Sequence, residues 1–130
     1  METSGHCLCG AVRFAFDAAP LWQAHCHCDS CRRQTASPMT TFLGLRDGTW
    51  RWTGAAPAVY ASSPGVARWF CPVCGSPIAY KSDRFPDETH FYACLLEDPR
   101  QVTPQEHVHW DARLPWLHLA DDLPKRGGAG

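Results

Sequence analysis

Cys71-Pro72-Val73-Cys74-Gly75 is the stretch of this 130-residue sequence that most strongly constrains the fold. Two cysteines three residues apart fit a knuckle, a tight turn whose backbone N–H groups point at the sulfurs of a metal site. Gly75 permits the positive φ that such turns often require. Because a structural zinc site takes four ligands and this segment supplies two, a second pair is expected elsewhere in the chain.

The segment Cys7-Leu8-Cys9-Gly10 is the candidate for that second pair. In a strand, residues i and i+2 point to the same face, so Cys7 and Cys9 could both direct sulfur at one ion about 2.3 Å away. With Cys71 and Cys74 they would complete a tetrahedral shell, which could stabilise the fold by on the order of 10 kcal/mol. Iron would accept the same four thiolates, but zinc is the usual metal of such a site.

A third cysteine group, Cys26, Cys28 and Cys31, lies within the segment Cys26-His27-Cys28-Asp29-Ser30-Cys31. Three protein ligands plus an exchangeable position are typical of a zinc ion that takes part in chemistry. The alternative is a second structural zinc, closed by a distant histidine or by Cys94. Packing in the core is the commoner role of a lone cysteine such as Cys94.

The polar residues beside these cysteines each have an ordinary structural interpretation. Strand alternation would place His25 and His27 on the opposite side from the sulfurs of the third group. Arg32 and Arg33, directly after Cys31, could offset the negative charge of the thiolates or hold a substrate carboxylate, although a surface ion pair is the commoner role.

Composition and charge limit the remaining possibilities. No apolar stretch approaches the roughly 20 residues that cross a bilayer, and the first residues do not resemble a secretory signal, so we expect a cytoplasmic protein with no membrane association. In a reducing compartment, eight clustered cysteines indicate metal ligands rather than disulfides. A formal charge of −1 without a basic patch argues against a nucleic-acid partner.

The residue pattern predicts a mainly β domain over residues 1–124, followed by a flexible tail over 125–130. Val12, Phe14 and Phe16 alternate with smaller or polar residues, which is typical of a half-buried strand. The Asp-Gly pair at 47–48 favours a hairpin that would place Trp50 and Trp52 on one face. Helical periodicity is weak, with room for a turn or two around 29–35 and after Pro104. Further strands are expected at 40–45, 49–53, 58–61, 66–70, 78–81, 89–95 and 106–110.

Three segments in this order resemble the glutathione-dependent formaldehyde-activating enzymes, a family whose domain is shared with centromere protein V. These are the segment 5–12 (Gly-His-Cys-Leu-Cys-Gly-Ala-Val), the segment 26–33 (Cys-His-Cys-Asp-Ser-Cys-Arg-Arg) and the segment 70–77 around the Cys71 knuckle. One departure is Ala36, where the family commonly has glycine.

The resemblance implies a β-tent fold of packed antiparallel sheets with zinc knuckles, and two zinc ions per chain. Cys7, Cys9, Cys71 and Cys74 would hold the structural zinc. Cys26, Cys28 and Cys31 would hold a catalytic zinc, where the thiol of glutathione binds before it adds to formaldehyde to give S-hydroxymethylglutathione.

The predicted function is therefore that of a carbon–sulfur lyase that activates glutathione or another small thiol for reversible addition to formaldehyde or a related aldehyde. Zinc favours the deprotonated thiol at neutral pH and places a nucleophilic sulfur beside an electrophilic carbonyl. The alternative is a non-catalytic zinc-binding β-tent module that binds a protein partner.

Overall fold

The computed structural model describes residues 2–129; Met1 and Gly130, the outer ends of the predicted domain and tail, lie outside this range. Within it, strands dominate and a single α-helix is present, which confirms the mainly β class. The elements in chain order are β1 (Thr3–His6), β2 (Arg13–Phe16), β3 (Trp22–Cys26), α1 (Asp29–Thr35), β4 (Thr40–Arg46), β5 (Trp50–Trp52), β6 (Ala58–Ser63), β7 (Val66–Phe70), β8 (Pro77–Ser82), β9 (Glu88–Tyr92), β10 (Glu106–Val108) and the 3-10 turns Ala93–Leu95, Pro99–Gln101 and Trp110–Ala112.

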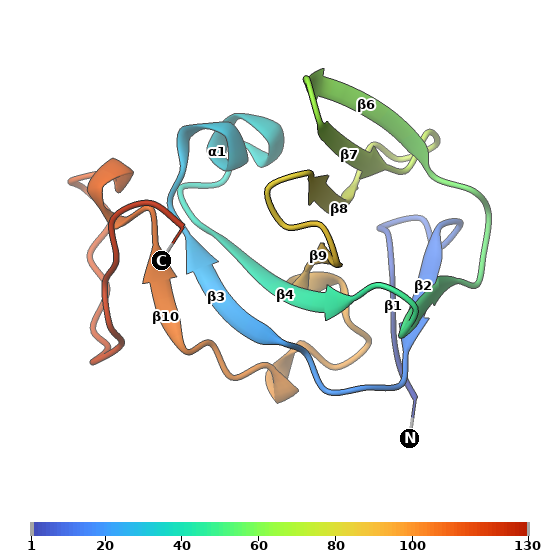
Figure 1. Ribbon diagram of the computed structural model, residues 1–130, viewed down its shortest axis with the longest axis horizontal. Helices are drawn as coiled ribbons and strands as arrows, with labels where there is room; N and C mark the ends of the chain where they lie inside the picture. Colours follow the sequence, from blue (N-terminus) through green and yellow to red (C-terminus); the bar gives the residue numbers. More distant parts are fainter. Residues whose placement is uncertain (1, 130) are drawn as a thin grey trace.

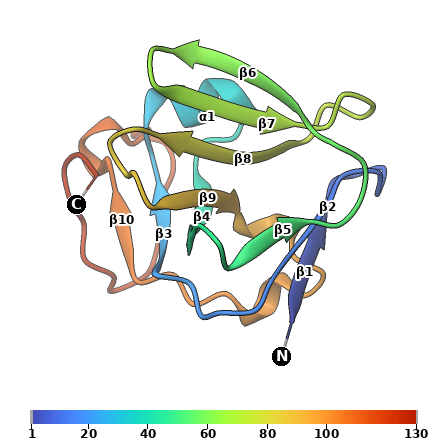
Figure 2. The same cartoon turned by 45° about the vertical axis from the view of Figure 1, so that its right-hand side comes forward.

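The strands form two sheets (Figure 1). The small sheet has the order β1-β2-β5, and the large sheet has the order β10-β3-β4-β9-β8-β7-β6. Figure 2 shows β6, β7, β8 and β9 as successive neighbours in the large sheet. Pairing is antiparallel as predicted, except that the short strand β10 runs parallel to β3.

The core lies between the small sheet and one face of the large sheet. Phe14 of β2 stacks on Phe91 of β9 with ring centroids 4.5 Å apart. Trp50 and Trp52 share one face, as predicted, and both rings pack against Phe91 at 5.0 and 5.7 Å. Burial of such apolar surface is the main favourable contribution to folding.

The predicted hairpin around Asp47 and Gly48 is wrong in its pairing. The turn exists, with Gly48 at φ 93° and the Thr49 N–H donating to the Arg46 carbonyl at 3.1 Å. However, β4 pairs on both sides with β3 and β9, so β5 leaves the turn and pairs with β2. After Pro104 the chain forms β10, which lies within the strand predicted at 106–110, and then the 3-10 turn Trp110–Ala112, the helical turn expected in this region.

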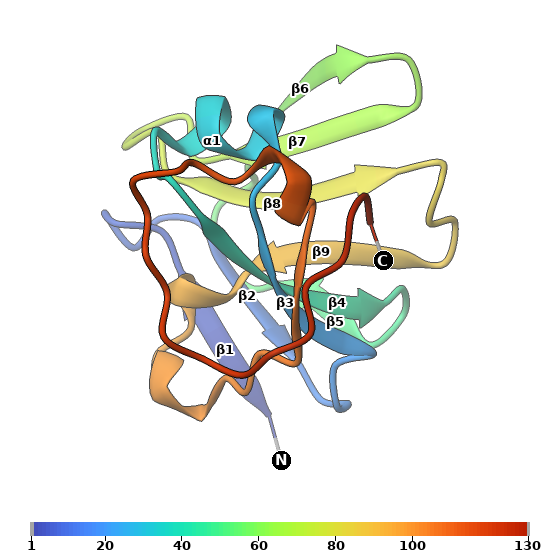
Figure 3. The same cartoon turned by 90° about the vertical axis from the view of Figure 1, so that its left-hand side faces the viewer.

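The chain after β10 loops round and returns to lie beside that strand, parallel to it (Figure 3). The His107 N–H donates to the Pro124 carbonyl, and the Arg126 N–H donates to the His107 carbonyl, both at 2.9 Å. Backbone hydrogen bonds therefore reach the segment for which the sequence predicts a flexible tail. Within residues 2–129, no helix is long and apolar enough to cross a membrane.

Candidate metal centres and the adjoining cavity

The first cysteine cluster consists of Cys7, Cys9, Cys71 and Cys74, whose sulfurs all lie within 4.8 Å of one another. The Cys7 and Cys9 sulfurs are 3.6 Å apart, and those of Cys9 and Cys71 are 3.8 Å apart. A tetrahedron of sulfurs around an ion at 2.3 Å has edges of about 3.8 Å. The spacing therefore fits one tetrahedral metal ion, and it is far longer than the roughly 2.05 Å of a disulfide bond.

Two tight turns present these sulfurs, one between β1 and β2 and the other between β7 and β8. Gly10 and Gly75 adopt φ values of 82° and 81°, a conformation that glycine enters without steric cost. The prediction that Cys7 and Cys9 meet through strand alternation is wrong, because β1 ends at His6 and both cysteines lie in the turn. The pair still converges, since the turn folds back on itself through the Gly10 N–H, which donates to the Cys7 carbonyl at 3.1 Å.

Backbone N–H groups surround the sulfurs of the first cluster. The Val12 N–H donates to Cys7 Sγ, and the N–H groups of Val73 and Cys74 donate to Cys71 Sγ, each at 3.4 Å. Such donors stabilise thiolates and are typical of a knuckle. Since one turn belongs to the small sheet and the other to the large sheet, a metal ion here would join the two sheets.

The second cluster consists of Cys26, Cys28 and Cys31 and comes from one short segment. Cys26 ends β3, Cys28 is the N-cap of α1, and Cys31 lies in its first turn, where its N–H donates to Cys28 Sγ at 3.3 Å. The Cys26 and Cys31 sulfurs are 3.7 Å apart, which again fits the edge of a metal tetrahedron. Among residues 2–129, no fourth His, Cys, Asp or Glu ligand atom joins this group within 4.8 Å.

The three thiols are electrostatically unequal. Hydrogen bonds from Cys26 and Cys31 lower the pKa of Cys28 to about 2, and the bond to Cys28 raises the pKa of Cys26. The group is thus poised to carry negative charge on at least one sulfur, which a cation would compensate.

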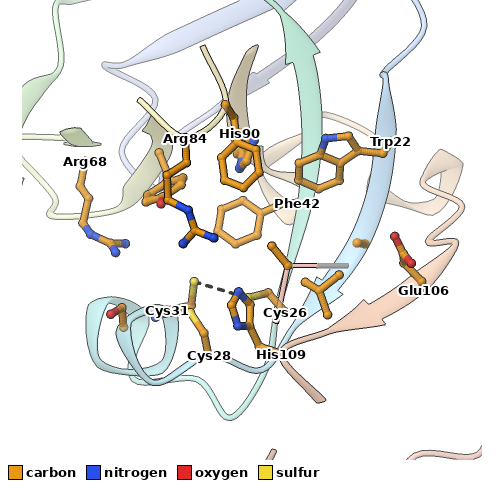
Figure 4. Close-up of a pocket in the computed structure, with 16 residues that line it drawn as sticks. Trp22, Cys26, Cys28, Cys31, Phe42, Arg68, Arg84, His90, Glu106 and His109 are labelled. Carbon is orange, nitrogen blue, oxygen red and sulfur yellow. Dashed lines mark hydrogen bonds between the residues drawn. The ribbon is translucent and has the colours of Figure 1, made fainter. Parts of the chain in front are cut away.

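The second cluster opens into a cavity of about 450 Å³, within the ~300–1,000 Å³ range of small-molecule sites. Figure 4 shows the cysteines on one side and aromatic and basic side chains opposite them. The four cysteines of the first cluster are absent from its wall. The cavity is lined by Trp22, Ala24, Cys26, Cys28, Ser30, Cys31, Phe42, Arg68, Tyr80, Arg84, Phe85, His90, Glu106, Val108, His109 and Ala129.

Strand register builds the far wall as one row across the large sheet. The row runs through the cross-strand partners Trp22, Gly44, His90, Tyr80 and Arg68, on β3, β4, β9, β8 and β7 in turn. Because Gly44 has no side chain, the Trp22 and His90 rings meet over it at 4.6 Å. His90 then packs on Tyr80 at 5.5 Å, and the Arg68 guanidinium lies 4.9 Å from the centre of the Tyr80 ring.

The histidines beside the second cluster face away from it, as strand alternation predicts. His27 is fully buried, and its Nε2 lies 2.8 Å from Nδ1 of His107, whose Nε2 lies 2.9 Å from the Asp121 carboxylate. His25 packs on the other side of His107, with ring centroids 4.9 Å apart. These groups form a polar cluster behind the second cysteine cluster rather than a part of its cavity.

The remaining candidate residues also have clear positions. Arg32 and Arg33 pair with Asp29 at 3.3 and 3.0 Å and do not line the cavity, which is the ion-pair role that the sequence favours. Cys94 is exposed and belongs to neither cluster, so it closes neither site, and the expectation that it packs in the core is wrong.

Sequence reasoning missed the wall opposite the cysteines, above all Trp22, Arg68, Arg84 and His90. One signal was available: Arg68 is a charged residue at the centre of the otherwise apolar strand Val66–Phe70. The row itself depends on pairings between distant strands, which no local pattern contains.

The fold and the two clusters define a small, mainly β domain with two cysteine sites that can each hold a metal ion. The model of the family described as glutathione-dependent formaldehyde-activating enzyme matches residues 2–112. The chain therefore belongs to this family, as its three cysteine segments suggested.

One similar solved structure is the crystal structure of a protein from Rhodobacter sphaeroides, a structural-genomics target. It is 25% identical, covers 78% of this chain and 97% of its own, and superposes with a TM-score of 0.63. No curated protein sequence matches the chain.

Proposed function

We propose that this protein catalyses the reversible addition of glutathione or another small thiol to formaldehyde or a related aldehyde, as a carbon–sulfur lyase. In this proposal Cys7, Cys9, Cys71 and Cys74 hold a structural zinc ion, and Cys26, Cys28 and Cys31 hold a catalytic one. The observation that carries the proposal is the contrast between the two clusters: four sulfurs close the first, whereas three sulfurs of the second face a cavity.

The reaction balances without a redox partner. The thiol loses its proton, the sulfur forms a bond to the carbonyl carbon, and the π electrons of the carbonyl move to oxygen, which takes up a proton. Zinc at the second cluster would supply the stabilisation of the thiol in its deprotonated form at neutral pH.

The chain itself supplies binding and orientation. Cys26, Cys28 and Cys31 occupy one side of the metal position and leave the cavity side for the substrate sulfur. The rings of Trp22, Phe42 and Phe85 line the cavity and would limit the access of water to the reacting sulfur and carbonyl. Holding the two reactants together converts a bimolecular step into an effectively unimolecular one. A cytoplasmic location, where glutathione is abundant and thiols stay reduced, belongs to the same proposal.

The test compares two cysteine-to-serine variants. Cys31→Ser removes a ligand of the second cluster, whereas Cys94→Ser makes the same chemical change at an exposed cysteine outside both clusters. Zinc per chain is measured by elemental analysis, folding by circular dichroism, and turnover as the rate of hemithioacetal formation above the uncatalysed rate. The cobalt-substituted forms are titrated with glutathione and followed by visible absorption.

We expect the Cys94→Ser protein to keep two metal ions, the spectral response to thiol and the activity. The Cys31→Ser protein should stay folded through the first cluster but lose turnover and the response to thiol. If no thiol changes the spectrum of the cobalt-substituted wild-type protein, or if Cys31→Ser unfolds the whole domain, the second site is structural. A module that binds a protein partner then becomes the better interpretation.

A further inference from the structure

Arg68 is a buried cation with an unused hydrogen-bond donor on the wall of the cavity. Arg68 is only 8% exposed, and its guanidinium forms no ion pair with any residue in the described range. Its Nη1 atom is buried and has no hydrogen-bond partner among residues 2–129. A buried donor of a charged group is costly to leave unpaired, so this position calls for an acceptor.

The guanidinium is held in place by neighbours that do not neutralise it. Nε donates to Ser62 Oγ at 3.1 Å, and the guanidinium lies over the Tyr80 ring at 4.9 Å. Tyr80 in turn packs against His90 in the row across the sheet. These contacts fix the orientation of Arg68 and leave Nη1 without a hydrogen-bond partner among the described residues.

Arg84 adds a second positive charge to the wall that contains Arg68, and the carboxylate on the cavity wall is already paired. Arg84 lines the same wall, forms no ion pair in the described part of the chain and lies 5.8 Å from the centre of the Phe85 ring. Figure 4 shows both guanidinium groups on the side of the cavity that faces Cys31 and Cys28. The acidic group of the wall, Glu106, is paired with Arg126.

We propose that the ligand of this cavity is a thiol that also carries a carboxylate, bound with its sulfur at Cys26, Cys28 and Cys31 and its carboxylate at Arg68 and Arg84. The proposal rests on the proposed function, since it assumes that a thiol enters the site. A planar guanidinium matches the two oxygens of a carboxylate, which makes arginine the preferred residue for this recognition. Glutathione and short mercapto acids both belong to this class.

Arg68 has one competing role, because three thiolates and a zinc ion together carry a negative charge that a nearby cation would offset. The two roles differ in what they predict for ligands. A carboxylate partner discriminates between acidic and neutral thiols, whereas a counter-charge for the metal cluster acts on all thiols alike.

The experiment therefore uses two probes with the same carbon chain, 3-mercaptopropionate and 3-mercaptopropionamide, titrated into the cobalt-substituted protein and followed by visible absorption. The variants are Arg68→Gln and Arg68→Lys, with Arg100→Gln as the matched control. Arg100 is exposed, pairs with Asp98 and lies outside the cavity wall. Metal content is measured for every protein.

We expect the wild-type and Arg100→Gln proteins to bind the acid about tenfold or more tightly than the amide, as a charge-assisted hydrogen bond predicts. Arg68→Gln should reduce this ratio to about one and leave the affinity for the amide within about twofold. Arg68→Lys keeps the positive charge but not the planar pair of donors, so we expect an intermediate ratio of acid to amide affinity. If the Arg68→Gln protein does not fold, the Arg68→Lys protein provides the test.

The proposal is overturned if the acid keeps its advantage in Arg68→Gln, if Arg68→Gln weakens both probes equally, or if the wild-type protein does not distinguish them. In each of these cases a thiol still binds, so the proposed function stands. If neither probe and no glutathione changes the spectrum of the wild-type protein, the proposed function itself fails, and this inference fails with it.

Discussion

Replacing Gly44 by alanine should destabilise the protein and disturb the cavity, although Gly44 is not itself a candidate ligand. A Cβ atom added at Gly44 would lie 2.3 Å from both Cε2 and Nε1 of Trp22, whereas ordinary contact begins at 3.4 Å. The indole would have to move by about 1 Å, and because it lines the cavity, such a shift would change the shape of the cavity wall. The indole is held where it is by the hydrogen bond from Trp22 Nε1 to Glu88 Oε1 at 2.9 Å.

Two effects set the magnitude. Overpacking of this kind costs about 1–3 kcal/mol. Displacing Trp22 also weakens its hydrogen bond to a carboxylate, and such bonds contribute about 1.5–3 kcal/mol when intact. Because the indole can keep part of that bond as it shifts, the sum should be about 2–4 kcal/mol, which lowers the Tm of a chain of this length by roughly 7–15 °C.

The assay is urea unfolding at a fixed concentration of free zinc, with and without Trp22→Leu in the background. In the Trp22→Leu protein the indole is gone, and Gly44→Ala should cost about 1 kcal/mol or less. The difference between the two backgrounds isolates the contact between residues 22 and 44. If Gly44→Ala costs the same in both backgrounds, the close approach of Trp22 is not the reason for glycine at this position, and the description of the row is refuted.

Three further predictions concern other parts of the molecule. Cys71→Ser should lose the metal of the first cluster together with the folded circular dichroism spectrum, while Cys94→Ser should change neither, as zinc analysis and spectroscopy can show. Ala36, the C-cap of α1, has a φ of 60°, a left-handed conformation that strains alanine but not glycine. Ala36→Gly should therefore raise the free energy of unfolding by about 0.5–1 kcal/mol in urea titrations. A lower free energy of unfolding would show that the backbone at Ala36 is not strained. Burial lowers the pKa of His90 below its ordinary 6.5, so the unfolded chain binds this proton more readily than the folded one. Stability should therefore be highest above pH 6.5 and decline as the pH falls, and His90→Gln should flatten that decline in unfolding curves recorded across the range.

Local features of the fold were predictable from the sequence because short-range chemistry determines them. The helix Asp29–Thr35 was expected at the observed residues, and Trp50 and Trp52 do share a face. The spacing predicts the membership of both cysteine clusters, even though the strand that it predicts at Cys7 and Cys9 is a turn. Four sulfurs can converge from a strand or from a turn, so this error left the composition of the cluster unchanged.

The features that failed all depend on which distant strands pair. The Asp47-Gly48 turn looks like a hairpin locally, but β4 already has β3 and β9 as neighbours, and β9 comes from a segment more than forty residues away. The same pairings decide that Arg68 shares a face with Cys26 rather than with the core. Register between distant strands is fixed only when the whole sheet forms, so local patterns indicate strands without revealing the wall of the cavity.

The different origins of the two clusters explain why one is closed and the other open. The first takes two sulfurs from each of two turns that belong to different sheets, so the chain approaches the metal position from both sides and leaves no free direction. The second takes all three sulfurs from residues 26–31, and so short a segment can cover only one side of an ion. The uncovered side faces a wall that includes Arg68, Tyr80 and His90 of β7, β8 and β9, strands that lie far from these cysteines in the sequence. Under the proposed function, metal binding and ligand choice would therefore be carried by separate parts of the chain. A relative that accepts a different thiol should accordingly differ at the row that ends in Arg68, while it keeps the three cysteines.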